Sequence, residues 1–160
     1  MSFSTSYYDA EFGQITFEVF QWVLERPAHL GDRTVPISVE FEPTQVGELS
    51  PLQRHAIRQA LTLPPDVLRT AASVVLQNYE VYREAIGEEE LPPLADPIEV
   101  WDQVTLSYIF VPPHVEYDLH TPSFMLKAEC SWDTEHGLEV RFRNGVADAA
   151  SQQGELDWND

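Results

Sequence analysis

The sequence predicts an α+β domain in which an antiparallel or mixed sheet of about five or six strands carries two central helices packed on one face. Alternating polar and apolar segments lie toward both ends of the chain, whereas helical periodicity is confined to its middle. The 160 residues suit one domain, and 43% of them are hydrophobic, too many for a disordered acidic chain. We expect a single folded domain over residues 1–150 and an acidic C-terminal tail over residues 151–160.

Two strands are expected in the first quarter of the chain. Residues 15–20 alternate as a half-buried strand does, with one face formed by Ile15, Phe17 and Val19. Residues 34–42 alternate in the same way, with one face formed by Val35, Ile37, Val39 and Phe41. Pro36 has no amide proton to donate, so this second strand lies at a sheet edge or its pairing begins after Pro36.

Two helices follow. Ser50-Pro51-Leu52-Gln53 supplies an N-cap, a proline at the first helical position and a glutamine two positions later, which predicts a capping box and a helix reaching about Leu61. A second helix begins at Pro64-Pro65 and ends at Gly87, and its core-facing stripe consists of Leu68, Ala72, Val75, Tyr79, Tyr82 and Ile86. Residues 88–102 are predicted to form an acidic, proline-interrupted loop with one helical turn over residues 98–102.

The last third of the chain predicts a central strand and a meander. Residues 104–111 are apolar at both parities, as in a strand covered on both faces. If residues 133–137 form a five-residue loop, Cys130 lies opposite Val140 and Glu129 lies opposite Arg141. Asn144-Gly145 predicts a two-residue hairpin turn, which places Phe142 opposite Ala147 and Arg141 opposite Asp148.

The charge of the chain bounds its partners. Nine basic and 27 acidic residues give a net charge of −18, which disfavours nucleic acid and favours encounter with a basic protein, although acidity also serves solubility alone. Four arginines and three acidic residues lie between Pro51 and Ile86, so a charge of −19 lies outside this helical segment.

Cysteine content and hydropathy suggest a compartment. The single cysteine, Cys130, excludes an intramolecular disulfide and a thiolate-rich metal site. The chain opens with neither a basic nor an apolar leader segment, and nowhere do 18 apolar residues run together. We therefore expect a cytoplasmic protein without a membrane partner.

Two constellations suggest chemistry, and both have a structural alternative. An extended chain would place His114, Glu116, Asp118 and His120 on one side, and imidazoles and carboxylates bind zinc, iron or manganese. Ligands two residues apart stand roughly 6.5–7 Å apart along a strand, so a polar surface loop is favoured over a metal site. Glu135 and His136 form an acid–histidine pair, but a hydrogen bond that holds the turn accounts for them better. We predict no catalytic residue, no metal and no cofactor.

Residues 132–138, W-D-T-E-H-G-L, carry a resemblance. They are similar to the C-terminal W-D-x-E-H-G-[LI] signature of a family of uncharacterised bacterial domains, which are often found among the immunity genes of polymorphic toxin systems. The resemblance implies a protein that neutralises another protein and implies no reaction. The leading hypothesis is an immunity-type inhibitor that occludes a basic toxin; the alternatives are a small metal-dependent hydrolase that uses residues 114–120 and a non-enzymatic assembly module. The residues expected to contact the partner are Glu88, Glu89, Glu90, Asp133, Glu135 and His136.

Overall fold

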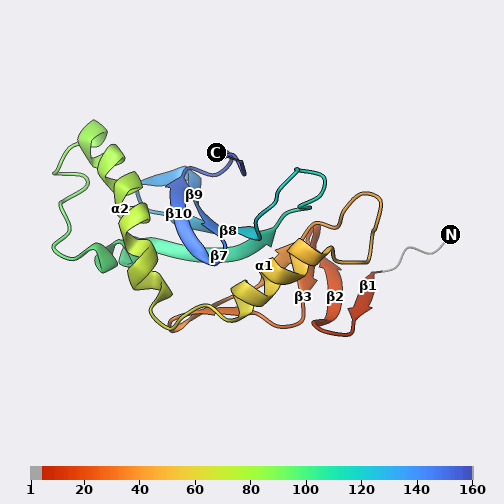
Figure 1. Cartoon of the computed structure of the whole chain (residues 1–160). Helices are drawn as coiled ribbons and strands as arrows, with labels where there is room; N and C mark the ends of the chain where they lie inside the picture. The colour runs from red at the N-terminus through yellow and green to blue at the C-terminus, as the bar shows by residue number, and fades with distance from the viewer. Residues whose placement is uncertain (1–4, 160) are drawn as a thin grey trace.

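The computed structural model describes residues 5–159 as ten strands, two α-helices and one 3-10 helix (Figure 1). The first half of the chain contains β1 (Ser6–Asp9), β2 (Gly13–Glu18), β3 (Gln21–Leu24), β4 (Ala28–Leu30), β5 (Arg33–Val35), β6 (Ile37–Val39) and α1 (Pro51–Leu61). The second half contains α2 (Val67–Ile86), the 3-10 helix η1 (Pro97–Gln103), β7 (Val104–Val111), β8 (Ser123–Cys130), β9 (Asp133–Arg143) and β10 (Val146–Ser151).

Eight of the strands form one mixed sheet in the order β1-β2-β3-β6-β7-β8-β9-β10. Its neighbours are antiparallel except β6 and β7, which run parallel, and β4 and β5 form a separate two-stranded sheet. The predicted α+β class is confirmed, but five to six strands was too few. The additional strands β1 and β3 have only four residues each, so neither contains enough of a period-two pattern to be recognised alone.

The two N-terminal strand predictions need correction. β2 ends at Glu18, and Val19 and Phe20 form a two-residue turn in which both have positive φ, 46° and 66°. The expected strand over 34–42 is divided at Pro36, because β5 before it pairs with β4 while β6 after it pairs with both β3 and β7. Pairing in the main sheet therefore begins after Pro36, as that proline's missing donor requires.

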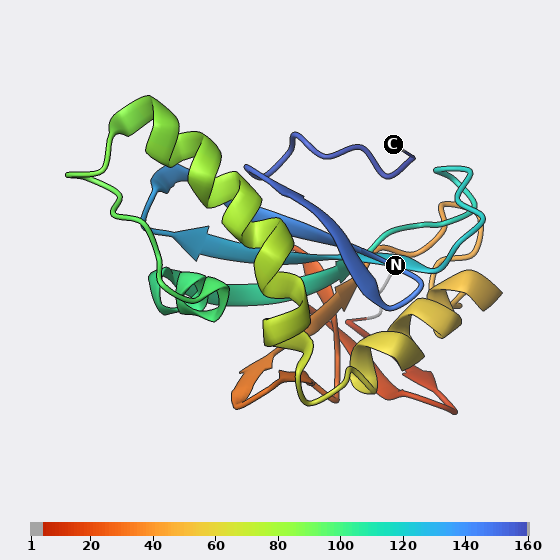
Figure 2. The same cartoon turned by 60° about the vertical axis from the view of Figure 1, so that its left-hand side comes forward.

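Both helices begin and end close to the predicted residues. Ser50 accepts a hydrogen bond from the Gln53 backbone at 3.4 Å and its own N–H donates to the Gln53 side chain at 3.1 Å, which confirms the capping box. The helices lie on the sheet face from which Leu126, Val140 and Phe142 enter the core (Figure 2). In α2 the stripe is buried at Ala72, Val75 and Tyr79 and emerges at its C-terminal end, where Ile86 is exposed.

The β8–β9 register differs from the prediction. The turn consists of Ser131 and Trp132 alone, so Val140 pairs with Leu126 and Arg141 lies opposite Met125 instead of Glu129. The segment expected to be a five-residue loop is instead the start of β9. A register shift between Ala128 and Cys130, opposite Gly137 at φ 73°, accommodates this segment within the ladder.

The β9–β10 hairpin is largely as predicted. Asn144 and Gly145 have φ of 53° and 82°, as a type I′ turn requires, and Phe142 pairs with Ala147. A bulge at Asp148 then places Arg141 opposite Ala149, yet the Arg141 Nε still lies 2.9 Å from the Asp148 carboxylate. The expected Arg141–Asp148 pair is therefore present, without Glu129 as its third member.

The C-terminal segment, residues 152–159, passes α2 at Gln152 and then lies against the sheet face that carries Lys127, Glu139 and Phe110. The Glu139 carboxylate on that face is 1% exposed and accepts hydrogen bonds from the backbone N–H groups of Gly154 at 2.9 Å and Leu156 at 3.0 Å, while Lys127 lies 2.7 Å away. Trp158 packs on Phe110 with ring centroids 6.3 Å apart. This C-terminal segment covers charged side chains of β8 and β9 that an open sheet would leave in water.

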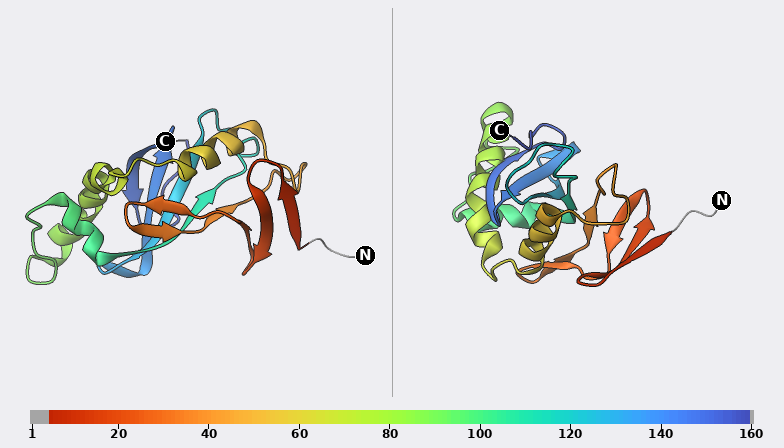
Figure 3. Two further views of the ribbon diagram at one scale, coloured as in Figure 1. Left: turned by 90° about the horizontal axis from the view of Figure 1, so that it is seen from below. Right: turned by 45° about the vertical axis from the view of Figure 1, so that its right-hand side comes forward.

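The molecule has two distinct ends (Figure 3). Strands β1, β2 and β3 lie at one end. The C-terminal half of α2, the loop that follows it, η1 and the β8–β9 turn lie at the other (Figure 1).

A substitution pair tests the β8–β9 register. A Cβ at Gly137 would lie 2.7 Å from the Ala128 carbonyl oxygen and 2.9 Å from Gln153 Nε2, whereas a Cβ at Gly145 meets only ordinary contacts. Gly145→Ala should lower the free energy of unfolding by about 1 kcal/mol through its positive φ alone. Gly137→Ala should cost roughly 1–3 kcal/mol more because the backbone must move. Urea denaturation measures both, and equal losses would contradict the register.

Candidate partner-binding surface

The few basic side chains are used within the fold. In residues 5–159, seven of the nine lie within 4.0 Å of a carboxylate: Arg54, Arg58, Arg69, Arg83, Lys127, Arg141 and Arg143. Arg33 instead donates to the backbone oxygens of Trp101 at 2.9 Å and Val104 at 3.0 Å. Most carboxylates of the described chain therefore have no basic side chain within ion-pair distance, and the surface is acidic.

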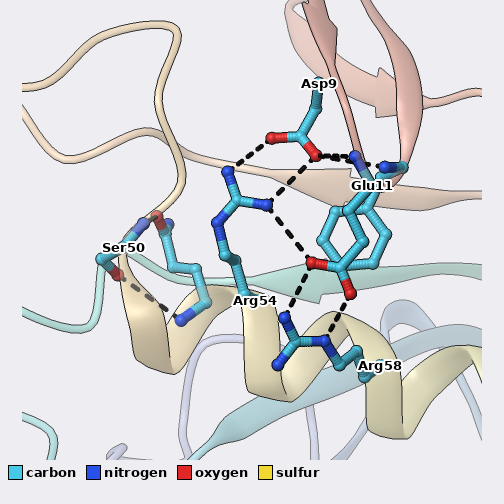
Figure 4. A network of polar contacts seen from close by, with 7 residues as sticks. Asp9, Glu11, Ser50, Arg54 and Arg58 are labelled. Atoms are coloured by element: carbon cyan, nitrogen blue, oxygen red, sulfur yellow. Dashed lines mark hydrogen bonds and ion pairs between the residues drawn. The ribbon is translucent and has the colours of Figure 1, made fainter.

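One basic cluster shows this internal use clearly (Figure 4). Asp9, near the end of β1, accepts hydrogen bonds from Arg54 of α1 at 2.6 and 3.1 Å, and Arg58 of α1 donates to Glu11. The Arg54 guanidinium, despite the opposing effect of burial, lowers the pKa of the Asp9 carboxyl. The cluster joins the β1–β2 turn to α1, so these charges serve the fold.

The predicted contact residues Glu88, Glu89 and Glu90 form an exposed turn directly after α2. Arg83 reaches the first of them at 3.1 Å while it also binds Glu80 at 2.7 Å. Within the described chain the carboxylates of Glu89 and Glu90 have no basic partner. The loop is anchored behind them, because Leu91 is buried and the Tyr79 hydroxyl donates to the Pro92 carbonyl at 2.6 Å.

The other three predicted contact residues have different surroundings. The Asp133 side chain is only 9% exposed, and it accepts hydrogen bonds from the Tyr82 hydroxyl at 2.6 Å and from the His136 backbone at 3.0 Å. The hydrogen bond to Asp133 raises the pKa of Tyr82 to about 12. Asp133 therefore fastens the start of β9 to α2. Glu135 and His136 remain exposed, and His136 also holds the turn through its ring contact with Asp133 at 3.1 Å.

The segment from His114 to His120 is a folded loop whose polar groups are occupied. His114 is fully buried; its Nε2 accepts from the Ser123 backbone at 2.9 Å, and its Nδ1 donates to the Pro112 carbonyl at 2.9 Å. The buried Glu42 carboxylate accepts from the backbone N–H groups of Val115 and Glu116. His120 lies in solvent beside Asp118. Both nitrogens of the His114 ring thus serve the fold, and in residues 5–159 no three His, Cys, Asp or Glu side chains are grouped so as to hold a metal ion.

Besides the acidic turn after α2, an acidic recess adjoins the β8–β9 turn. A surface cavity of about 400 Å³ is lined by seven residues that include Asp102, Glu129 and Thr134. The elements that line it, η1 and the adjoining parts of β7, β8 and β9, lie at the same end of the molecule as the turn after α2 (Figures 1 and 2). Asp102 and Glu129 are exposed, and neither has a basic partner within the described chain. These two residues were not predicted as contact residues, because strand register and the position of η1 bring them together.

The tip of the β2–β3 hairpin is a further feature that sequence reasoning missed. Val19 and Phe20 are 89% and 91% exposed, and both have the left-handed backbone conformation, which costs a non-glycine residue roughly 1–2 kcal/mol. Beside the tip a pocket of about 210 Å³ is lined by aromatic residues and by Glu40. Because Val19 and Phe20 continue the alternation of β2, the sequence concealed the turn.

A family model described as a domain of unknown function, DUF6985, matches residues 11–156. The chain belongs to this family. The matched stretch of the DUF6985 domain runs from the β1–β2 turn into the C-terminal segment that crosses the sheet. Searches of curated proteins and of solved structures find no match to the chain. Among residues 5–159 of this DUF6985 domain, neither α1 nor α2 is both long enough and apolar enough to cross a membrane.

The buried His114 predicts a pH dependence. Burial lowers its pKa, so below about pH 6.5 the unfolded chain binds a proton that the folded chain does not. The free energy of unfolding should therefore fall as the pH drops below about 6.5, by at most about 1.4 kcal/mol per pH unit for this one proton. Above that pH the stability from this group is fully present.

His114→Gln, which keeps one donor and one acceptor, should remove this part of the slope between pH 6.5 and 5. His120→Gln serves as the control because His120 is exposed. Urea denaturation across the pH range measures both variants. A slope unchanged in His114→Gln, or removed in His120→Gln, would show that another group is responsible.

Proposed function

We propose that this chain is a non-catalytic binding domain of the immunity type, which inhibits a basic protein by covering its functional surface. The observation that carries the proposal is the distribution of charge. Eight of the nine basic side chains are bound to carboxylates or backbone carbonyls of the same chain, so most of the exposed carboxylates have no basic side chain within ion-pair distance. Such a surface attracts a basic protein and repels nucleic acid.

The binding surface that we favour is the acidic end, defined as Glu88, Glu89, Glu90, Asp102, Glu129 and Glu135. All six are exposed. They belong to the turn after α2, to η1, and to the parts of β8 and β9 next to the turn that joins these strands, and these elements lie at one end of the molecule (Figure 1). The anchored backbone beneath them also supports the proposal, since Leu91, Tyr79 and Asp133 hold these turns in place. A preformed acidic surface binds without the entropic cost of ordering loops.

Inhibition would follow from occlusion and would require no turnover. In a partner whose basic active-site cleft binds a phosphate-bearing substrate, the carboxylates of this domain would contact the basic side chains that otherwise contact the phosphate, and so would cover the cleft. Asp133 would contribute by position only, because its carboxylate is engaged with Tyr82 and His136. Among the predicted contact residues, Glu89, Glu90 and Glu135 are the best placed to meet a cation directly.

The test uses proteins encoded beside this chain, each purified and assayed for binding and for its own activity. We expect one basic protein to bind one-to-one, to lose its activity, and to associate more slowly as salt rises from about 50 to 500 mM, because exposed charges are screened over roughly 8–10 Å. No binding by any basic neighbour, or binding that leaves activity intact, would contradict an immunity role.

The triple reversal Glu88→Lys, Glu89→Lys and Glu90→Lys should slow association about tenfold or more and change dissociation much less, since rim charges act chiefly on the association rate. A matched control reverses Glu25, Asp32 and Glu48, which are also exposed and lie outside the acidic end. Both variants change the net charge equally and should leave the thermal midpoint nearly unchanged. Equal slowing by both would assign the effect to net charge rather than to the acidic end.

A further inference from the structure

We propose that the β2–β3 hairpin docks a basic, apolar-containing segment of the partner protein, and that an arginine or lysine side chain of that segment enters the adjoining pocket. The surface, called the tip surface below, comprises Phe17, Val19, Phe20, Trp22, Glu40 and Phe110. The inference rests on the proposed function because both assume a basic protein as the partner. It concerns the other end of the molecule.

The turn residues are unfavourable for the fold itself. Val19 and Phe20 form a two-residue loop between the paired residues Glu18 and Gln21, and both need positive φ. Asparagine and glycine suit this conformation, whereas a β-branched valine does not. The same chain uses Asn144-Gly145 in the equivalent turn between β9 and β10. Strained, non-glycine residues of this kind cluster at functional sites.

The same two residues are also unfavourable for solubility. Val19 and Phe20 expose nearly their whole side chains, and Phe17 beside them is 45% exposed. By contrast, Phe124 and Phe142 are buried in the core, where their ring centroids are 4.8 Å apart. A contiguous exposed apolar group that adds little to the core and disfavours the turn in which it lies points to a binding surface.

The adjoining pocket determines the chemistry of the occupant. Four aromatic residues, Phe17, Phe20, Trp22 and Phe110, line it together with Glu40. The Glu40 carboxylate is exposed, and its one side-chain contact in the described chain is a weak hydrogen bond from the Tyr117 hydroxyl at 3.4 Å. Aromatic faces and a carboxylate together attract a guanidinium or an ammonium group, while the alkyl stem of that side chain packs on the rings.

Charge favours a basic partner over a second copy of this chain. Among residues 5–159, no lysine or arginine lines the pocket, and Glu18 stands at the base of the turn. Two copies that met at their tips would bring these carboxylates together in chains that each carry −18. A basic segment would supply the missing counter-charge and cover the apolar tip.

The experiment selects peptides from a random 16-residue display library on the full chain and measures their affinities for three variants. Val19→Asn with Phe20→Gly restores the preferred turn residues and removes the apolar tip. Glu40→Gln removes the carboxylate alone. Val81→Asn with Ile86→Asn removes two exposed apolar side chains of α2 as a control.

We expect the full chain to select peptides in which arginine or lysine adjoins a bulky apolar residue. Their affinity should fall about tenfold or more for the turn variant, which loses the apolar contacts, and for Glu40→Gln, which loses the charge-assisted contact. Their affinity for the control should be unchanged. The turn variant should also unfold at a temperature several degrees higher, because its strain is relieved. Weaker binding with greater stability excludes misfolding as the cause.

Several results would overturn the inference. If the selected peptides bind the turn variant as tightly as the full chain, they bind outside the tip surface and the inference fails. If those peptides instead lose affinity for the triple variant Glu88→Gln, Glu89→Gln and Glu90→Gln, the proposed function at the acidic end still stands. Selected peptides without basic residues contradict both proposals. A lower thermal midpoint for the turn variant removes the premise of a strained turn. Tip-dependent dimers in sedimentation, or tip-dependent binding to phosphatidylcholine vesicles, would assign the surface to a second copy or to a membrane instead.

Discussion

Scarcity of positive charge constrains this structure more than any other property. Nine basic residues accompany 27 acidic ones, and several of the basic side chains join separate elements of the fold. Arg54 and Arg58 join α1 to the β1–β2 turn, and Arg33 joins β5 to η1 and the start of β7. Each such contact either neutralises a carboxylate or donates hydrogen bonds to backbone carbonyls inside the fold. The carboxylates that remain face water, and the acidic surface follows from where the basic residues are used.

The C-terminal segment illustrates the same constraint. The chain has a single lysine, Lys127, and it lies 2.7 Å from the buried Glu139 carboxylate. A buried carboxylate is costly unless it is paired and hydrogen-bonded, and here the backbone of residues 154–156 supplies the remaining donors. Arg141 beside it is 4% exposed and binds Asp148. The outer face of β8 and β9 therefore depends on the segment that covers it, although a sequence pattern alone assigns such residues to solvent.

Local chemistry was predictable from the sequence, whereas relations between distant segments were not. The Ser50–Gln53 capping box and the Asn144-Gly145 turn each depend on a few adjacent residues, and both were predicted correctly. The start of pairing in the main sheet after Pro36 was one of the two alternatives that the proline allowed. The β8–β9 register failed because Asp133 to Gly137 has the composition of a turn. A bulge and a hydrogen bond to Tyr82, 51 residues earlier in the chain, instead keep that segment in the strand.

The candidate site likewise has a part that was predictable from local sequence and a part that was not. Exposure of Glu88–Glu90 followed from an acidic, proline-interrupted sequence, but the engagement of Asp133 and the proximity of Asp102 and Glu129 depend on how η1 and two strands pack. Val19 and Phe20 were hidden for a different reason. Apolar residues that continue a strand's alternation predict more strand, so an unfavourable turn cannot be recognised until its dihedral angles are known.

The two proposed surfaces differ in the physical range over which they act. Carboxylates at the acidic end influence a basic protein across roughly a Debye length, and so they act before contact and chiefly on the rate of association. The apolar tip acts only on contact, when Phe20 and its neighbours leave water, and so it governs dissociation. Because the elements that carry the two surfaces lie at opposite ends of the molecule (Figure 3), a partner that uses both must extend along the sheet. Salt would then slow its association without shortening the lifetime of the complex, and the turn variant would shorten that lifetime with little effect on association.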